Sequence, residues 1–316
     1  MLKMKSNQDK ITPDKPATVV GLGELIWDLL PDGKQLGGAT TNFAYISRLL
    51  GNTSILASRV GDDDLGREAH ARLARMGIVT DYLQCDSKHP TGTVGVQIDE
   101  RGEARFAMNE DSAWDYLEFT ERWEELAALV DIVCFGTMAQ RTSRARATIL
   151  RFIERTRPQA LRIFDVNLRH AFFSAQMLAR SLELATIVKL NDHELSRISG
   201  MLGLTAPNER SLARQMLDKF DLELVAITRG EKGSSLISNR EEIDHSGFKV
   251  DIADTIGAGD AFAAVLAHYY RRRVPLKSIS EVANRMGSWI STQVGATPEI
   301  SSQTLDKILG DLSAVR

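Results

Sequence analysis

A glycine-rich stretch that ends in an acid is the part of the sequence best suited to chemistry. It reads DTIGAGDAF over residues 254–262, and a helical pattern begins directly behind it. Gly257, Ala258 and Gly259 leave the main chain almost uncovered, so free N–H groups at the start of the helix could hold an anion. Asp260 stands at the same point, where its carboxylate could take a proton from a hydroxyl held beside a bound phosphate.

Helix capping is the alternative interpretation of this stretch, because Gly and Asp also begin helices that bind no ligand. Apolar residues recur at i, i+3, i+4 and i+7 from Phe262 to Tyr269, which predicts a helix with one apolar face. A Walker A loop is excluded, since Gly-x-x-x-x-Gly-Lys-Ser/Thr occurs nowhere in the chain. Capping and anion binding both stay open until the rest of the sequence is considered.

A second glycine-rich turn, near the start of the chain, also precedes a helical pattern. It reads LGGATTNFA over residues 36–44, and Gly51 ends the pattern behind it. Its Gly-Gly pair permits positive φ angles and a hinge. Asn42 falls in the first turn of the helix, where its amide could meet a ligand. A plain turn is the alternative.

Polar side chains follow strand after strand along the chain. They are Asp28, Asn42, Asp165, Asn167, Arg169, Asn191, Glu194 and Asp260. Open α/β sheets place ligands beyond the carboxyl ends of their strands, so these residues are expected to meet at one edge of a sheet. Together they predict a site for a polyhydroxyl ligand and a phosphate donor. Glu24 and Asp28, judged by position alone, read instead as two solvated acids in a loop.

Strands and helices alternate along most of the chain, which predicts a mostly parallel sheet with helices on both faces. The predicted strands are 18–23, 54–60, 132–135, 161–169, 187–190, 224–228, 235–237 and 243–250. Predicted helices follow the two glycine-rich turns and also cover 68–76, 124–129, 142–156, 279–294 and 305–315. Residues 91–108 break the alternation, because they predict an antiparallel hairpin that turns at 99–102 and covers something outside the main sheet.

Composition places the chain among ordinary globular proteins. Of its 316 residues 43% are hydrophobic, and the mixed charges sum to −3, so no basic surface points to nucleic acid. No apolar run approaches the roughly 18 residues of a membrane span. Residues 1–16 are polar and lack the apolar core of a signal peptide, so we expect a disordered tail before one domain at 17–316. Cys85 and Cys134 are read as reduced, buried thiols of a cytosolic protein.

Three further motifs do not indicate a functional site. Gly21-x-Gly23 lacks the third glycine of a dinucleotide-binding turn, which argues against an oxidoreductase. Residues 61–64, Gly-Asp-Asp-Asp, read as a solvated turn. His193 has no second histidine at the spacing of a zinc site.

Taken together, the motifs resemble the ribokinase-like (PfkB-type) carbohydrate kinases, and the resemblance covers nearly all of the chain behind the tail. Its specific parts are residues 37–44, the stretch 254–262, Asn191-x-x-Glu194 and Thr228-x-Gly230-x-x-Gly233. Within the family the chain is most similar to bacterial fructokinases, through residues 23–28, 42–45, 90–94 and 165–169. Thr40, Thr41 and Val166 depart from the fructokinase pattern.

The resemblance implies a Rossmann-like α/β/α three-layer sandwich with a mostly parallel sheet, plus a small β-sheet lid. The hairpin in residues 91–108 fits such a lid, and about 29–36 would complete it. Lids of this family often serve as dimer interfaces, so the resemblance also implies a homodimer through the lid.

The resemblance further implies ATP-dependent transfer of the γ-phosphoryl group to a primary hydroxyl of a ketohexose, with fructose O6 as the expected acceptor. In such a reaction a general base takes the hydroxyl proton while main-chain N–H groups hold the developing charge. The catalytic residues implied are Asp260 as the base, Gly257, Ala258, Gly259 and Asp260 as the N–H donors, and Arg169 to orient the sugar or contact a phosphate. The residues implied to bind the sugar are Asp28, Gly38, Asn42 and Asp260.

Nucleotide and metal sites follow from the same resemblance. The residues implied to contact the nucleotide are Thr228, Gly230, Gly233, Asn284 and Ser288. Asn191 and Glu194 would hold Mg²⁺ through water, because Mg²⁺ dehydrates reluctantly. Asp254 and Ile256 would hold a monovalent cation such as K⁺.

Other functions remain as alternatives. The sugar could be 2-keto-3-deoxygluconate, ribose, tagatose or an aminoimidazole riboside. A sugar-binding regulator without catalysis on the same fold is a different class, and the intact Asp260 argues against it.

Overall fold

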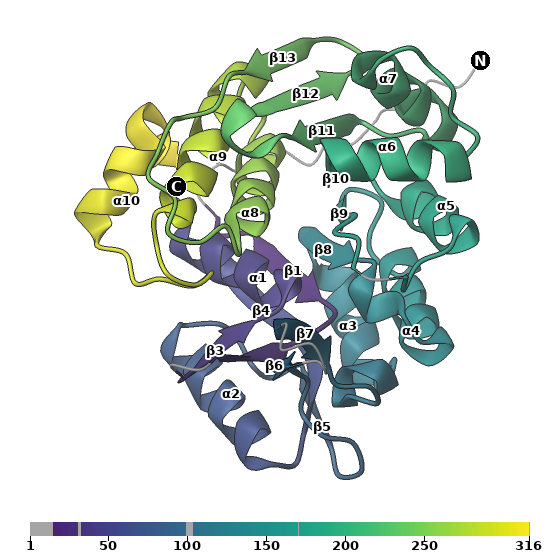
Figure 1. Ribbon diagram of the computed structural model, residues 1–316, viewed down its shortest axis with the longest axis vertical. Coiled ribbons are helices and arrows are strands. Elements are labelled where there is room, and N and C mark those ends of the chain that lie inside the picture. Colours follow the sequence, from purple (N-terminus) through teal and green to yellow (C-terminus); the bar gives the residue numbers. More distant parts are fainter. Residues whose placement is uncertain (1–14, 31–32, 99–103, 170, 316) are drawn as a thin grey trace, which may run out of the picture.

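The computed structural model describes residues 15–30, 33–98, 104–169 and 171–315. Within these ranges the chain forms a nine-stranded sheet with helices on both faces, and a separate four-stranded sheet (Figure 1). Residues 1–14 of the predicted tail and the predicted turn at 99–102 lie outside the described residues. In the part that is described, no helix combines the length and the apolar character that crossing a membrane requires.

Nine strands of the described residues make up the large sheet. In order across the sheet they are β13 (Glu242–His245), β12 (Ser234–Ser238), β11 (Leu224–Thr228), β10 (Ile187–Asn191), β9 (Leu161–Asp165), β8 (Ile132–Gly136), β1 (Thr18–Leu22), β4 (Thr53–Gly61) and β5 (Leu83–Asp86). Neighbouring strands from β11 to β5 are parallel, while β12 and β13 add antiparallel at one edge. The predicted mostly parallel sheet is therefore confirmed.

Two strands end earlier than predicted. Strand β13 stops at His245, because Gly247 adopts a φ of 80° and donates its N–H to Nδ1 of His245 at 2.9 Å. The prediction of a strand as far as residue 250 is therefore wrong. Strand β9 stops at Asp165, and residues 166–169 form a loop at the carboxyl end of the sheet.

Side chains of the buried strands alternate between two hydrophobic cores, one on each face of the large sheet. Val19 packs into the first core and its neighbour Val20 into the second. The first core is covered by α1 (Ala39–Leu49), α2 (Asp64–Arg75), α8 (Ala258–Arg271), α9 (Leu276–Ser291) and α10 (Ser302–Leu309). The second core is covered by α3 (Glu121–Leu129), α4 (Ser143–Glu154), α5 (Ala175–Leu184), α6 (Asp192–Met201) and α7 (Glu209–Phe220). These two helix layers around the sheet confirm the predicted three-layer sandwich.

Polar caps explain where several helices begin. Ser174, Asn191 and Asn208 each accept the N–H of the residue three positions further on, at the start of α5, α6 and α7. These three helices are absent from the sequence-based expectations, although their caps are visible in the sequence. Helix α2 begins at Asp64, earlier than predicted, because the side chain of Asp63 caps it.

The smaller sheet has the strand order β3-β2-β6-β7 among the described residues. Its strands are β2 (Ile26–Leu30), β3 (Gly33–Gly37), β6 (Thr93–Ile98) and β7 (Ala104–Met108). Strands β6 and β7 form the predicted antiparallel hairpin, while β2 pairs antiparallel with β3 and parallel with β6. The expected second sheet is therefore present, and it begins a few residues before the predicted 29–36 segment.

Asp63 joins the smaller sheet to the end of β4. Its carboxylate accepts the N–H of Thr91 at 2.8 Å and the hydroxyl of Thr91 at 2.7 Å, and that hydroxyl accepts the N–H of Gly61 at 2.9 Å. Burial opposes ionisation, but the hydrogen bonds from Thr91 and Gly66 outweigh it and lower the pKa of Asp63. The interpretation of residues 61–64 as a solvated turn is therefore wrong for Asp63.

Replacing Thr91 with Val, which has nearly the same size, should lower the free energy of unfolding by about 1–3 kcal/mol. The reason is that the N–H of Gly61 and the carboxylate of Asp63 both lose the hydroxyl they bind. Urea unfolding measures the change. Thr205→Val, at an exposed position, is the matched control and should change this free energy by less than about 0.5 kcal/mol. Equal unfolding midpoints for wild type and Thr91→Val would contradict the prediction.

The two cysteines differ in their environments. Cys134 is buried in the middle of the large sheet, as predicted. Cys85 is exposed, and the prediction of a buried thiol is wrong for it. It lies on β5, the edge strand of the large sheet, whose place at the edge depends on the topology of the whole fold. Both cysteines are free thiols.

Candidate active site

Helix α8 begins in the glycine-rich stretch, with Gly257 at its N-cap in the left-handed region at a φ of 81°. No side chain caps this helix. Among the described residues, the N–H groups of Gly259 and Asp260 have no acceptor, and that of Ala258 reaches only the carbonyl of Thr255, at 3.3 Å. Capping by the protein therefore does not account for the stretch, and the free N–H groups are available to an anion.

A close contact requires glycine at position 257 of the stretch, and a second close contact favours it at position 259. A Cβ atom on Gly257 would lie 2.5 Å from Cβ of Ala296. A Cβ atom on Gly259 would lie 2.7 Å from Nζ of Lys189. The glycines therefore let the main chain approach β10 and the segment behind α9, while they keep the N–H groups uncovered.

Asn42 and Asp260 are 218 positions apart in the sequence and meet in the structure. Nδ2 of Asn42 donates to Oδ2 of Asp260 at 2.8 Å, so α1 and α8 bring the two side chains together. Burial raises the pKa of Asp260, whereas Lys189, the bond from Asn42 and Arg169 act in the opposite direction. These three groups favour the ionised carboxylate, which is the form that can accept a proton.

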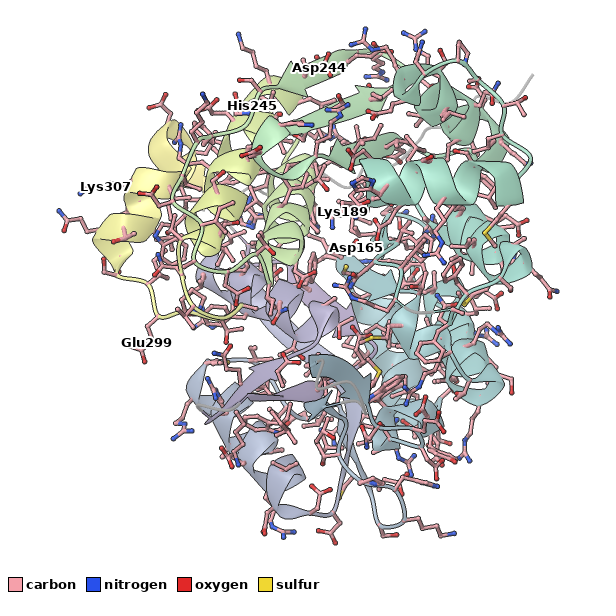
Figure 2. The ribbon with its side chains drawn as sticks, viewed as in Figure 1. Asp165, Lys189, Asp244, His245, Glu299 and Lys307 are labelled. Carbon is pink, nitrogen blue, oxygen red and sulfur yellow. The ribbon has the colours of Figure 1, made fainter. Side chains whose placement is uncertain are left out.

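A buried ion pair lies behind the glycine-rich stretch. Nζ of Lys189 is 3.1 Å from each carboxylate oxygen of Asp165, and Figure 2 labels both side chains near the centre of the molecule. Burial opposes the charge of Lys189, but the carboxylates of Asp165, Asp260 and Glu194 outweigh it and raise its pKa. Burial raises the pKa of Asp165 to about 7, against the attraction of Lys189. Lys189 was missed from the sequence, where a lysine inside a buried strand is the available indication.

The loop behind β9 carries Arg169 to the same region. The hydroxyl of Thr137 donates to the carbonyls of Val166 at 2.8 Å and Asn167 at 3.1 Å, and Asn167 adopts a φ of 39°. The side chain of Arg169 is exposed, and its charge acts on the carboxylate of Asp260. The structure therefore places Arg169 within electrostatic range of Asp260.

Glu24 connects the end of β1 to the glycine-rich turn of residues 36–44. Its Oε1 accepts the N–H of Ala39 at 3.1 Å, and its main-chain carbonyl accepts the hydroxyl of Thr40 at 2.7 Å. Gly38 has a φ of 102°, and a Cβ atom there would lie 2.7 Å from that carbonyl oxygen. Glu24 is only 1% exposed, so its interpretation as a solvated acid is wrong.

Asp28 reaches the site from strand β2 of the smaller sheet. Its Oδ2 lies 2.7 Å from the place that a Cβ atom on Gly37 would take. Burial raises the pKa of Asp28, and the charge of Asp254 raises it further, so Asp28 is not the fully solvated acid that its position alone indicated. On the neighbouring strand, Gln35 is pressed against Gly295, where a Cβ atom would lie 2.3 Å from its Oε1. The smaller sheet therefore contacts the segment behind α9.

Three of the predicted nucleotide-binding residues lie at the end of β11 and in the turn that follows it. Thr228 is the last residue of that strand, and Gly230 turns the chain at a φ of 57° with open space around its Cα. Gly233 has a packing reason to be glycine, because a Cβ atom there would lie 1.9 Å from the carbonyl oxygen of His245. The glycine at 233 is thus explained without a nucleotide, and its nucleotide role stays a prediction.

The other two predicted nucleotide-binding residues lie on helix α9. Asn284 is buried, and its Nδ2 donates to Oγ of Ser234 at 2.8 Å and to the carbonyl of Ser280 at 2.7 Å. Ser288 is half-buried, one turn further along the same helix. The amide nitrogen of Asn284 is engaged within the protein, and contact of either residue with adenine stays a prediction.

Asn191 and Glu194 form a reciprocal cap at the start of α6. Oδ1 of Asn191 accepts the N–H of Glu194, and Oε2 of Glu194 accepts the N–H of Asn191, both at 2.8 Å. Oε1 of Glu194 accepts the N–H of Leu168 at 2.8 Å. Since both carboxylate oxygens already bind the main chain, they fit contact with Mg²⁺ through water better than direct ligation. The described residues contain no cluster of three or more His, Cys, Asp or Glu arranged to hold a metal ion.

Asp254 links the segment before α8 to the segment behind α9. Its Oδ1 accepts the N–H of Ile256 at 2.9 Å, and its Oδ2 accepts the N–H of Gly295 at 3.2 Å. Two main-chain donors thus fix the carboxylate beside the glycine-rich stretch. Binding of a monovalent cation by Asp254 and Ile256 stays a prediction.

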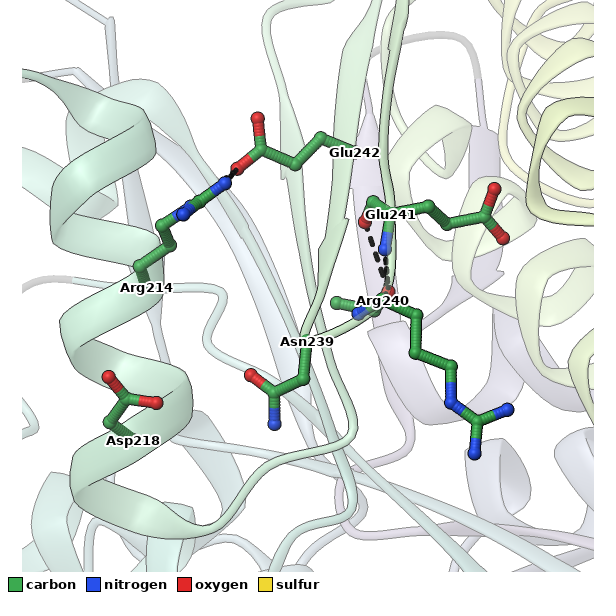
Figure 3. A pocket seen from close by; sticks show the side chains of 7 residues that line it. Arg214, Asp218, Asn239, Arg240, Glu241 and Glu242 are labelled. Carbon is green, nitrogen blue, oxygen red and sulfur yellow. Dashed lines mark hydrogen bonds and ion pairs between the residues drawn. The ribbon is translucent and has the colours of Figure 1, made fainter.

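A pocket of about 390 Å³ lies elsewhere, between α7 and the β12–β13 hairpin (Figure 3). Arg214 on α7 pairs across it with Glu242 on β13, at 2.6 Å. The N–H of Glu241 donates to Oγ of Ser238 at 3.1 Å, which closes the tip of the hairpin. None of the predicted site residues lines this pocket, so it does not belong to the site.

The chain is similar to known proteins over most of its length. Residues 32–303 match the pfkB family of carbohydrate kinases. A fructokinase of Escherichia coli is 30% identical over 306 residues, which cover 89% of this chain and 95% of that protein. The structure of an uncharacterized sugar kinase of Pyrococcus horikoshii is 27% identical with a TM-score of 0.79, and the match covers 94% of this chain and 100% of that one. The structure of a Vibrio cholerae fructokinase with fructose, ADP and calcium is 26% identical with a TM-score of 0.78, covering 93% and 99%.

The family match includes both glycine-rich turns. It begins just before β3 of the smaller sheet and ends within α10, so it spans the turn of residues 36–44 and the stretch 254–262. The similarity therefore extends to both sheets and both helix layers of the fold. The chain belongs to the pfkB family and is an ATP-dependent carbohydrate kinase.

Proposed function

We propose that this kinase transfers the γ-phosphoryl group of ATP to a primary hydroxyl of a ketohexose, with O6 of fructose as the acceptor. One observation carries the reaction: the free N–H groups at the start of α8 lie beside Asp260, which is hydrogen-bonded to Asn42 of the other glycine-rich turn. Fructose is favoured because the E. coli relative is a fructokinase and the V. cholerae fructokinase was solved with fructose and ADP.

In the proposed mechanism Asp260 is the general base. It takes the proton of the acceptor hydroxyl as that oxygen attacks the γ-phosphorus in line and ADP leaves. Lys189 and Arg169 favour the ionised form of the Asp260 carboxylate against the effect of its burial, and Asn42 holds it in place. The N–H groups at the start of α8 stabilise the charge that develops on the transferred phosphoryl group. Each such donor contributes about 3 kcal/mol to stabilising a transition state. The donors proposed here are those of Gly257, Ala258, Gly259 and Asp260.

The two substrates are proposed to meet at Asp260. The sugar would contact Asp28, Gly38 and Asn42, with Arg169 orienting the sugar or contacting a phosphate. Support comes from the position of Asp28 on the smaller sheet and of Gly38 and Asn42 at the start of α1. The nucleotide would lie along Thr228, Gly230, Gly233, Asn284 and Ser288.

Mg²⁺, when bound with ATP, supplies charge neutralisation for the phosphate groups. Asn191 and Glu194 would hold its water shell, and Asp254 and Ile256 would hold K⁺ next to the helix start. Closure of the smaller sheet over the sugar would exclude water from the reaction. We also expect a homodimer through this sheet, and a cytoplasmic reaction, in keeping with two free thiols.

A panel of sugars with ATP and Mg²⁺ tests this function. The panel contains fructose, tagatose, ribose, 2-keto-3-deoxygluconate and an aminoimidazole riboside, because Thr40, Thr41 and Val166 depart from the fructokinase pattern. We expect kcat/KM for fructose to exceed that of each other sugar by at least about tenfold. Phosphorus NMR of the product should place the phosphate on O6.

Two outcomes would contradict parts of this proposal. A higher kcat/KM for another sugar would replace fructose and leave the kinase mechanism intact. Binding of a sugar without turnover of any of them would favour the non-catalytic regulator. Neither Asp260 nor the uncovered N–H groups would then have a catalytic role.

A further inference from the structure

Glu24 is a buried acid beside the glycine-rich turn of residues 36–44, and the mechanism above gives it no role. It lies in the short connection between β1 and β2, where the large sheet leads into the smaller one. Its Oε1 accepts the N–H of Ala39, and its carbonyl accepts the hydroxyl of Thr40. These bonds fix its carboxyl group relative to the first turn of α1, which carries Asn42.

The second oxygen of this carboxyl group, Oε2, is buried and has no hydrogen-bond partner among the described residues. Two more buried polar atoms without a partner belong to the first turn of α1: Oγ1 of Thr41 and Oδ1 of Asn42. Buried polar groups in folded proteins are nearly always hydrogen-bonded. Two of these unpaired atoms belong to the first turn of α1, and the third belongs to the acid that is hydrogen-bonded to this turn. Together they indicate a polar ligand that binds there.

The chemistry of the carboxyl group narrows the kind of ligand. Burial raises the pKa of Glu24 to about 7, and Asp260 on α8 adds to this, while the N–H groups of Glu24 itself and of Ala39 and the charge of Arg169 act against it. Near neutral pH, Oε2 is therefore a donor in some molecules and an acceptor in others. A hydroxyl group can pair with both forms, because it donates and accepts. A fully ionised phosphate or an ammonium group pairs with only one.

We propose that Oε2 of Glu24 hydrogen-bonds a hydroxyl group of the sugar, which makes Glu24 a further substrate-binding residue. The inference rests on the proposed function, since it assigns a polyhydroxyl acceptor to the space beside Asn42 and Asp260. Glu24 contacts the sugar from the side of the large sheet, whereas Asp28 reaches it from the smaller sheet. It thereby selects sugars that carry a hydroxyl at the position facing Oε2.

Glu24→Met tests the contact, because methionine is similar in size and has no hydrogen-bonding oxygen. On the panel sugar with the highest wild-type kcat/KM, we expect KM for the sugar to rise about tenfold and KM for ATP to stay within about twofold. Glu24→Gln keeps polar atoms at both positions and should stay within about threefold of wild type. Glu154→Met, at an exposed position on α4, is the matched control and should behave as wild type.

Deoxy analogues of the same sugar separate a direct contact from a general effect on folding. In wild type, loss of the hydroxyl that meets Oε2 should lower kcat/KM about tenfold, and in Glu24→Met the same loss should have no further effect. Equal losses in the two proteins for every analogue would overturn the proposal, and would point to a water molecule beside Oε2. If Glu24→Met does not fold, the analogues are compared in wild type alone, and an equal kcat/KM for the sugar and every analogue would overturn the proposal.

Different measurements can contradict the proposed reaction and the proposed role of Glu24. Wild-type turnover of the panel decides the reaction. If wild type binds a sugar without turnover, the Kd from calorimetry replaces kcat/KM, and the comparison of analogues still decides whether Glu24 contacts the sugar.

Discussion

Replacing Asp260 with Asn should lower kcat by about three orders of magnitude or more, with little change in the affinity for ATP. The asparagine side chain has the same shape and can still accept the bond from Nδ2 of Asn42, so the site should stay assembled. It cannot take the proton of the acceptor hydroxyl, and it lacks the negative charge that Lys189 and Arg169 favour. Steady-state kinetics measures the first effect, and calorimetric titration with ATP measures the second.

The control for this change is Asp81→Asn, at an exposed position outside the site, which should keep full activity. The pH profile of the wild type provides a second measurement. Because burial raises the pKa of Asp260, kcat/KM should fall as the pH drops through a value above the usual pKa of about 3.9 for an aspartate. Residual activity of Asp260→Asn within about tenfold of wild type would show that another group accepts the proton.

Local sequence patterns were sufficient to predict the parts of the site that depend on the conformation of the main chain. Gly38 and Gly257 both adopt positive φ angles and both precede a helix, so a glycine-rich turn with a polar residue in the first helical turn behind it marks these helix starts. The same patterns pointed to Asn42 and Asp260, because each lies in the first turn of its helix. The large sheet was predictable for a similar reason, since buried parallel strands read as short apolar runs.

Fully or partly buried charges could not be predicted in the same way. Glu24 reads as a solvated acid, Asp63 as part of a solvated turn, and Lys189 as one residue of a strand. Their partners lie 15, 28 and 24 positions away in the sequence, respectively. Whether a charged side chain is buried depends on which elements pack over it, and a local pattern does not contain this information. The pattern does show the type of residue, and a lysine inside an apolar strand is the indication to follow.

Replacing Lys189 with Met should lower the free energy of unfolding by about 3–5 kcal/mol, because it leaves Asp165 buried without its cation. Asp165→Asn should have a smaller effect. The charge of Lys189 would still have Asp260 and Glu194 as neighbours in that variant. Urea unfolding of the two single variants and the double variant measures each free energy.

The double variant, Asp165→Asn with Lys189→Met, should regain most of the stability lost in Lys189→Met, because neither residue then carries a charge in the protein interior. Its activity should nevertheless stay well below wild type. Lys189 lies against Gly259 and favours the ionised form of Asp260, and the double variant restores neither interaction. Additive losses of stability in the double variant would contradict a coupled pair. Recovery of stability without recovery of kcat would separate the role of Lys189 in folding from its effect on the catalytic base.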